Sequence, residues 1–277
     1  MTLVSPAALI ASRNGAGVAA FNIITLEHLE AFVTAAEGHQ TGVILQLSQN
    51  AVKYHGGLEP VAGAILERVR ESSVPFAVQL DHASDITLIR ASARMGFTSI
   101  MYDGSTLSYQ DNVKTTRSLA NELHDLDIWV EAELGEIGGK DGVHIATART
   151  EPREAADFVS STGVDGLAVA VGSSHAMTDK TARLDVRLIE AIHAAVPVPL
   201  VLHGSSGIAE PLIAEAVRAG ISKVNFGTRF NVVMTDAIRL HLATHPAVTD
   251  PRRYLAAGRA AIKADAETLL KVLHFES

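Results

Sequence analysis

The chain contains no cysteine among its 277 residues. Disulfide bonds and thiolate metal ligands are therefore excluded. If the protein holds a metal ion, histidine and carboxylate side chains are the ligands that remain for it.

Clusters of basic residues and long apolar segments are also lacking. The net charge is −8, and no block of lysine or arginine interrupts the sequence, so we expect no nucleic-acid partner and no binding to an anionic membrane. No apolar run approaches the roughly 18 residues of a membrane-spanning helix. Residues 1–13 lack the basic and apolar regions of a signal peptide. We therefore expect a cytoplasmic location.

A regular alternation of short apolar runs and amphipathic segments fills the chain. Eight apolar or β-branched runs begin near Val18, Val43, Phe76, Ser99, Ile128, Gly166, Pro199 and Lys223. Segments with helical periodicity separate them, the first capped by Thr25 and ended by Gly38. The pattern predicts an α/β fold, a (β/α)8 TIM barrel formed by residues 1–277 as one domain, with 251–273 as an additional C-terminal helix. The rival is an open doubly wound sheet, which usually has fewer strands and often a G-x-G-x-x-G fingerprint that this sequence lacks.

Three histidines each follow one of these apolar runs, namely His82, His175 and His203. Because the carboxyl ends of parallel strands meet at one rim of a barrel, the three imidazoles can converge on one metal ion and leave a position open for substrate. This is the pattern of a catalytic zinc site. Asp81, directly before His82, gives that site a titratable neighbour. We expect structural or surface roles for the other nine histidines.

Polar residues also follow most of the other runs. They include Asn22, Ser48, Asp103, Asn225 and Thr228, and the sixth run is followed by the small residue Gly172. The small residues at 204–207 follow the seventh run, and 225–228 end the eighth. Loops after strands seven and eight are a recurrent phosphate site in such barrels, although each could be an ordinary tight turn. Glu131 and Glu133 alternate along the fifth run, so one can reach the metal while the other supports the barrel interior.

Several of these segments resemble a known family. QLDHA at 79–83, MYDGS at 101–105, EAELG at 131–135 and LHGSSG at 202–207 are similar to motifs of the class II, zinc-dependent ketose-bisphosphate aldolases. AFNI at 20–23 and TGVDGLAV at 162–169 match too. The resemblance runs from about residue 3 to residue 272, with the motifs in the family's order. The family includes fructose- and tagatose-bisphosphate aldolases.

The resemblance implies a reaction and a role for each matching residue. The reaction is the reversible cleavage of a phosphorylated ketose, such as fructose or tagatose 1,6-bisphosphate, to dihydroxyacetone phosphate and an aldehyde, through a metal-stabilised enediolate. Zn²⁺ would be held by the three histidines, with Glu133 close to it. Asp81 would be the acid/base at the hydroxyl of the acceptor carbon. The resemblance also implies a monovalent cation, Na⁺ or K⁺, near the phosphate. We expect a homodimer or homotetramer.

The phosphorylated sugar would be held by several residues at the rim. The candidates are Asn22, Ser48, Gly172, Gly204, Ser206, Asn225, Thr228 and Arg229. A lysine Schiff base is the other aldolase mechanism. No lysine stands out at the carboxyl end of a run, because Lys223 lies at the start of its run or inside it, so the metal route is favoured.

Two positions, Ala176 and Arg229, and the short, acid-poor loop at 140–144 depart from the family's pattern. Ala176 stands where glycine is usual, and Asp141 is the remaining acidic candidate in a loop that often carries a catalytic carboxylate. Arg229 replaces an acidic residue, and it either pairs with an anionic group on the acceptor half or lies in a subunit contact. Since all three surround the substrate, the alternative is a class II-type aldolase for a different keto-sugar or keto-acid phosphate.

Two further classes of function are open. A zinc barrel hydrolase usually carries an H-x-H pair on its first strand, and residues 21–23 have none. A non-catalytic sugar-phosphate-binding protein on the same barrel is disfavoured because Asp81 is retained.

Overall fold

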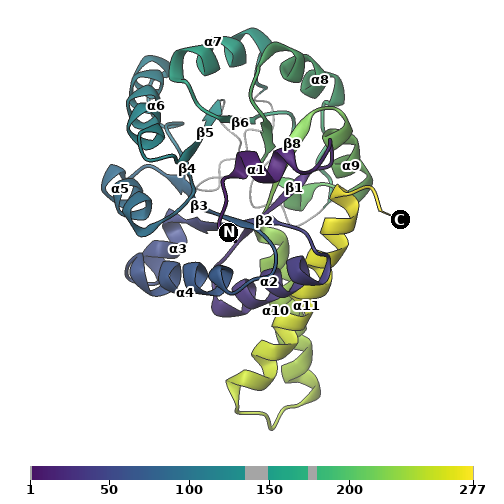
Figure 1. Ribbon diagram of the computed structural model, residues 1–277. Helices are drawn as coiled ribbons and strands as arrows, with labels where there is room; N and C mark the ends of the chain where they lie inside the picture. The colour runs from purple at the N-terminus through teal and green to yellow at the C-terminus, as the bar shows by residue number, and fades with distance from the viewer. Residues whose placement is uncertain (1, 135–148, 174–179, 277) are drawn as a thin grey trace.

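Eight parallel strands close into a barrel in chain order, as the computed structural model shows for residues 2–134, 149–173 and 180–276 (Figure 1). The strands are β1 (Val18–Asn22), β2 (Val43–Ser48), β3 (Phe76–Ala83), β4 (Ser99–Tyr102), β5 (Trp129–Leu134), β6 (Gly166–Val169), β7 (Leu200–Leu202) and β8 (Ile221–Phe226). The predicted TIM barrel is confirmed. Each strand begins within two residues of the expected position, and β8 begins earlier because Ile221 already pairs with Leu200.

Helices follow the strands and form the outer ring of the barrel in Figure 1. They are α2 (Leu26–Gly38), α3 (Gln49–Tyr54), α4 (Glu59–Arg70), α5 (Ile86–Met95), α6 (Tyr109–His124), α7 (Pro152–Thr162), α8 (Val186–Ala195) and α9 (Glu210–Arg218). The expected boundaries of α2 are confirmed. Thr25 is its N-cap and forms a capping box with His28, and the helix ends at Gly38.

A short helix, α1 (Pro6–Ala11), lies across the centre of the barrel in Figure 1. Its Leu9 is buried in a small apolar cluster with Val18, Ala20, Ile44 and Ala77. Because these residues lie in the first halves of their strands, α1 covers the amino-terminal end of the barrel. The carboxyl-terminal end is the one that carries chemistry in this fold.

The inside of the barrel is polar at several levels. Side chains alternate along each strand, so Val130, Ala132 and Leu134 of β5 join the apolar core under the helices. The intervening Glu131 and Glu133 are buried as well. The same alternation buries Gln46 on β2, Gln79 and Asp81 on β3, and Lys223 and Asn225 on β8. Branched aliphatic side chains usually fill this space. We therefore expect these polar groups to form hydrogen bonds with one another or to take part in the functional site.

Two long helices extend away from the barrel as a hairpin, which we call the arm (Figure 1). They are α10 (Thr228–Thr244) and α11 (Pro251–Leu273), the latter being the expected additional C-terminal helix. The helices pack closely at Gly258, where a Cβ atom would lie 2.9 Å from the side chain of Met234. At the far end of α11, the carbonyl of Leu273 accepts a hydrogen bond from Gly17, just before β1.

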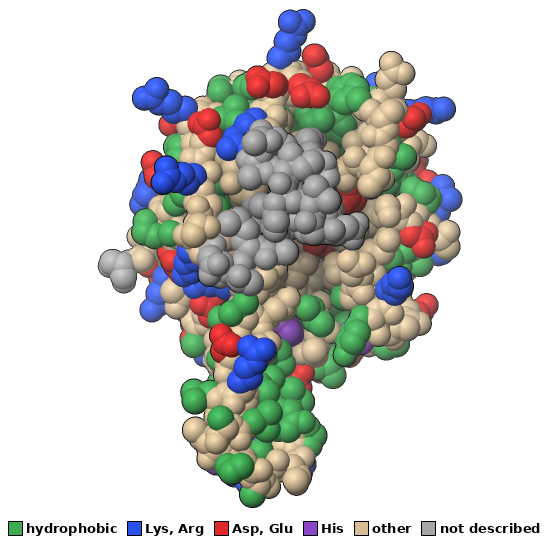
Figure 2. Space-filling view, turned by 180° about the vertical axis from the view of Figure 1, so that it is seen from behind, with side chains coloured by type: hydrophobic (Ala, Val, Ile, Leu, Met, Phe, Trp, Pro, Cys, Tyr) green, Lys and Arg blue, Asp and Glu red, His purple; other side chains and the backbone are tan. Residues whose placement is uncertain are grey.

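Apolar side chains are exposed on the arm. Leu240 of α10 is 66% exposed, and Val232 and Leu242 are also exposed. Figure 2 shows hydrophobic side chains over the surface of this hairpin. Nowhere in the described part of the chain is a helix both long and apolar enough to cross a bilayer.

Candidate active site

An irregularity in β3 places two adjacent side chains at the site. Three positions separate Leu80 from Ala83 on β3, while their partners on β4, Ile100 and Tyr102, are two positions apart. His82 has a φ of +46°, a conformation that non-glycine residues rarely adopt. The extra residue is a β-bulge, which re-aims side chains and is common beside active sites. It gives Asp81 and His82 different sets of partners.

Two amides hold the carboxylate of Asp81. Asn22 on β1 donates from Nδ2 to Oδ2 at 2.9 Å, and Gln46 on β2 donates from Nε2 to Oδ1 at 3.1 Å. Asp81 is only 2% exposed, so both oxygens are fixed inside the barrel mouth. Asn22 was a predicted substrate-binding residue, and in the structure its amide orients Asp81. Gln46 was not identified from the sequence as a site residue, although a polar side chain within the apolar run of β2 indicates a buried polar group.

His82, Glu133 and His203 form a cluster that can hold a metal ion. One possible ligand atom from each residue lies within 4.8 Å of the others. The two imidazole rings are 4.8 Å apart between centroids. Ligands lie about 2.0–2.2 Å from a zinc ion, so these atoms are near the spacing that a shared ion needs, and imidazole with carboxylate is a donor set that zinc accepts. The residues therefore fit a zinc ion.

A carboxylate orients each of the two histidines. Asp103 Oδ2 lies 3.2 Å from Nδ1 of His82, and the other oxygen of Asp103 accepts hydrogen bonds from Ser105. Glu131 Oε1 lies 3.0 Å from Nε2 of His203. Metal-binding histidines usually make such a bond with the nitrogen that does not bind the metal. Asp103 was predicted from the sequence to lie at the rim, but its contact with His82 was not predicted.

Electrostatics around His203 favour a positive charge. Burial alone would lower the pKa of His203, but hydrogen bonds with Glu131 and Glu133 raise it to about 9. Burial would raise the pKa of Glu131, whereas the charge of Lys223 and the hydrogen bond with His203 lower it to about 2. The two glutamates therefore stabilise a cation at this position, whether it is a proton or a metal ion.

The loops after β7 and β8 come together beside this cluster of strand ends. Ser206, in the short 3-10 helix Ser205–Gly207, accepts a hydrogen bond of 2.9 Å from the backbone N–H of Arg229 in the first turn of α10. Gly204 precedes that 3-10 helix with a φ of +67°. Thr228 is the first residue of α10, and Asn225 Oδ1 is buried without a hydrogen-bond partner. The N-terminus of a long helix thus lies in the loops predicted to bind phosphate. The unpaired oxygen of Asn225, near the end of β8, is an acceptor and would face a donor or a cation there, not a phosphate oxygen.

Two other predicted rim residues have local structural roles. Ser48 caps α3 by accepting a hydrogen bond of 3.1 Å from the N–H of Ala51. Gly172 has a φ of +113°, and a Cβ atom there would lie 2.2 Å from the carbonyl oxygen of Arg183. A side chain at this position would displace the backbone at Arg183. Their contact with substrate stays a prediction.

Arg229 is held by two acidic residues of the same chain. Its Nε and one terminal nitrogen donate to both oxygens of Asp265 on α11 at 2.6 Å each, and the other terminal nitrogen donates to Glu210 on α9 at 2.8 Å. Its side chain is 11% exposed. These contacts join three helices, and they favour a role in the fold over the pairing with an anionic substrate that the sequence suggested.

Three residues discussed from the sequence lie outside the described residues. They are His175, the third predicted zinc ligand, together with Ala176 and Asp141. Their roles stay predictions.

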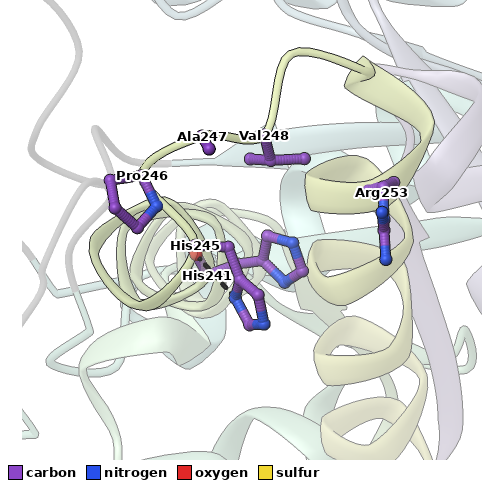
Figure 3. Close-up of a pocket in the computed structure, with 6 residues that line it drawn as sticks. All are labelled: His241, His245, Pro246, Ala247, Val248 and Arg253. Carbon is purple, nitrogen blue, oxygen red and sulfur yellow. Dashed lines mark hydrogen bonds between the residues drawn. The ribbon is translucent and has the colours of Figure 1, made fainter.

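A separate pocket lies at the tip of the arm, at the junction of α10 and α11 (Figure 3). The rings of His241 and His245 stack there at 4.5 Å between centroids, and Arg253 faces them from α11. This pocket belongs to the hairpin and contains none of the residues at the barrel rim.

The fold and the cluster together are typical of a barrel enzyme whose strands carry, at their carboxyl ends, side chains that can hold a metal ion. A family model described as fructose-bisphosphate aldolase class-II matches residues 7–276. A fructose-bisphosphate aldolase of Geobacillus stearothermophilus is 37% identical over 270 residues, which are 95% of this chain and 94% of that protein.

Two solved structures are similar over nearly the whole chain. The YdjI aldolase of Escherichia coli K12 matches with a TM-score of 0.86 at 27% identity, and the match covers 98% of this chain and 97% of the YdjI chain. A putative fructose-1,6-bisphosphate aldolase from Coccidioides immitis also has a TM-score of 0.86 at 27% identity, with 96% and 95% covered. The chain belongs to the class II fructose-bisphosphate aldolase family and is an aldolase, a lyase of carbohydrate metabolism.

Proposed function

We propose that the protein is a zinc-dependent aldolase that reversibly cleaves a ketose 1,6-bisphosphate, of the fructose or tagatose type, to dihydroxyacetone phosphate and an aldehyde. The observation that carries this proposal is the pairing of the His82, Glu133 and His203 cluster with a buried, doubly hydrogen-bonded Asp81. His82, His203 and the predicted ligand His175 would hold the zinc ion, with Glu133 beside it. A bound zinc ion supplies Lewis-acid stabilisation of negative charge on the substrate oxygens.

Asp81 would move the proton. In the cleavage direction, its carboxylate takes the proton of the hydroxyl on carbon 4 as the bond between carbons 3 and 4 breaks, and in synthesis it returns that proton. The amides of Asn22 and Gln46 keep both carboxylate oxygens in place. A carboxylate fixed in this way needs little rearrangement to reach the substrate.

The loops after β7 and β8 would bind the 1-phosphate. Backbone N–H groups at the start of α10 and near Gly204, with the side chains of Ser206, Asn225 and Thr228, supply donors for phosphate oxygens. A sodium or potassium ion near the phosphate is part of the same proposal. So are a cytoplasmic location and a homodimer or homotetramer in which the exposed apolar side chains of the arm are covered.

A substrate panel tests this function. Fructose and tagatose 1,6-bisphosphates, the two ketose 1-phosphates and 6-phosphorylated keto-acids should be assayed for release of dihydroxyacetone phosphate or, for the keto-acids, of the corresponding ketonic product. We expect one of the two bisphosphates to have the highest kcat/KM. A higher kcat/KM for a keto-acid phosphate would favour the alternative substrate class suggested by Ala176 and Arg229.

Arg229 provides a second test, which separates a role in the fold from one in substrate binding. We expect Arg229→Ala to lower the free energy of unfolding by about 2–3 kcal/mol, since Asp265 and Glu210 lose charge-assisted hydrogen bonds. Urea denaturation measures this change. Arg239→Ala is the matched control, because Arg239 lies on the same helix in an exposed pair with Asp236, and its loss should change stability far less.

Kinetics with two substrates complete this test. If Arg229 serves the fold, KM changes by the same factor for a bisphosphate and for the matching ketose 1-phosphate. A KM increase of about tenfold or more that is confined to the bisphosphate would instead support the substrate role predicted from the sequence.

A further inference from the structure

A fully buried ion pair lies inside the barrel next to the metal cluster. Lys223 on β8 and Glu131 on β5 are both 0% exposed, and Nζ of the lysine donates to Oε2 of the glutamate at 2.6 Å. Gln79 on β3 donates to the same oxygen at 3.3 Å. Charges are costly to bury, and branched aliphatic side chains commonly fill the interior of such a barrel. The proposed proton transfer and phosphate binding make no use of this pair.

The other oxygen of Glu131 connects the pair to His203. Oε1 lies 3.0 Å from Nε2 of the imidazole, while Nδ1 of the same ring lies 3.2 Å from Glu133. An ionised carboxylate only accepts hydrogen bonds, so both ring nitrogens carry a hydrogen in the metal-free protein, and a bound metal ion would replace the hydrogen on the nitrogen that faces the metal cluster. Glu133 belongs to the metal cluster and Glu131 does not. The nitrogen presented to the metal position is therefore Nδ1.

We infer that Lys223 is a positioning residue for the proposed metal site: through Glu131 it fixes the imidazole of His203 with Nε2–H on the carboxylate and Nδ1 directed toward Glu133. This inference rests on the proposed zinc site. Its physical basis is that the lysine holds Oε2, so the carboxylate cannot turn and Oε1 stays in line with the ring. Outer partners of this kind orient metal-binding histidines and raise the affinity of the site. Lys223 itself touches neither the substrate nor the metal.

The test measures zinc affinity directly, by competition with a chromophoric chelator, in the full-length protein. We expect Lys223→Met to raise the zinc dissociation constant by about tenfold to a hundredfold, the usual effect of losing an outer partner of a metal ligand. The absorption spectrum of the cobalt-substituted protein should change as well, because the geometry of His203 is less constrained.

Gln79→Met is the matched control. It removes a neutral donor to the same oxygen of Glu131 and places the same side chain in the same part of the barrel. We expect a smaller loss of zinc affinity than in Lys223→Met. Equal losses in the two variants would assign the effect to altered packing and overturn the positioning role.

A double variant covers the case in which Lys223→Met does not fold, since that variant leaves Glu131 as an uncompensated buried charge. Lys223→Met/Glu131→Gln removes both charges and keeps an amide oxygen for the Nε2–H of His203. We expect it to fold and to bind zinc more weakly than the native protein. Native zinc affinity and a native cobalt spectrum in a folded variant without Lys223 would overturn the inference. If the native protein itself binds no zinc, the proposed function fails. That result differs from native zinc affinity in a variant without Lys223, which overturns only the positioning role.

Discussion

Asp81→Ala should retain zinc while kcat for cleavage falls by about 10²-fold to 10⁴-fold, the range seen when a general acid/base is lost. The physical reason is that this carboxylate, held between Asn22 and Gln46, is the group placed to take the proton of the hydroxyl on carbon 4. Zinc content by atomic absorption and kcat in the same preparation give the result. Asp81→Asn should give a similar loss of activity while keeping one acceptor oxygen for the two amides.

Asp103→Asn is the contrasting variant. Asp103 contacts Nδ1 of His82, so its replacement should weaken zinc binding, and activity should return when zinc is in excess. Activity of Asp81→Ala should not return under those conditions. If Asp81→Ala instead loses zinc in proportion to its activity, Asp81 serves the metal site and the proposed proton transfer is incorrect.

Removal of the metal should abolish cleavage altogether. After treatment with a strong chelator we expect no measurable release of dihydroxyacetone phosphate. Added zinc or cobalt should restore the activity, because the metal ion would again stabilise the negative charge left on the cleaved half of the substrate.

Borohydride treatment in the presence of substrate is the control for a covalent route. We expect no adduct by mass spectrometry. Lys223, the lysine that the barrel interior contains among the described residues, is buried and bound to Glu131. A trapped lysine adduct would contradict the metal assignment.

The sequence predicted the barrel and much of its rim because each strand is a short apolar run followed by polar residues. His82 and His203 could be found in this way, and the structure brings them together with Glu133. The bulge at His82 could not be found, since QLDHA contains no glycine or proline to indicate it. It can be recognised only from the pairing of β3 with β4 in the folded barrel.

Pairings across the barrel were also beyond the sequence. The alternation of Glu131 and Glu133 showed that both face one side, but the height of Lys223 on β8 relative to Glu131 on β5 depends on the strand register around the barrel. Arg229 shows the same limit. Its partner Asp265 lies 36 positions later on α11, and only the folded hairpin brings the two together.

The closure of the barrel also has a consequence for how the chain folds. β1 pairs with β8, and Gly17, just ahead of β1, is hydrogen-bonded to Leu273. During synthesis the first strand therefore waits for its second neighbour until almost the whole chain has left the ribosome, and until then a growing sheet has an open edge. Contacts between such distant positions slow folding and leave strand edges available for aggregation. We therefore expect the edge of β1 to stay open to such contacts until β8 pairs with it.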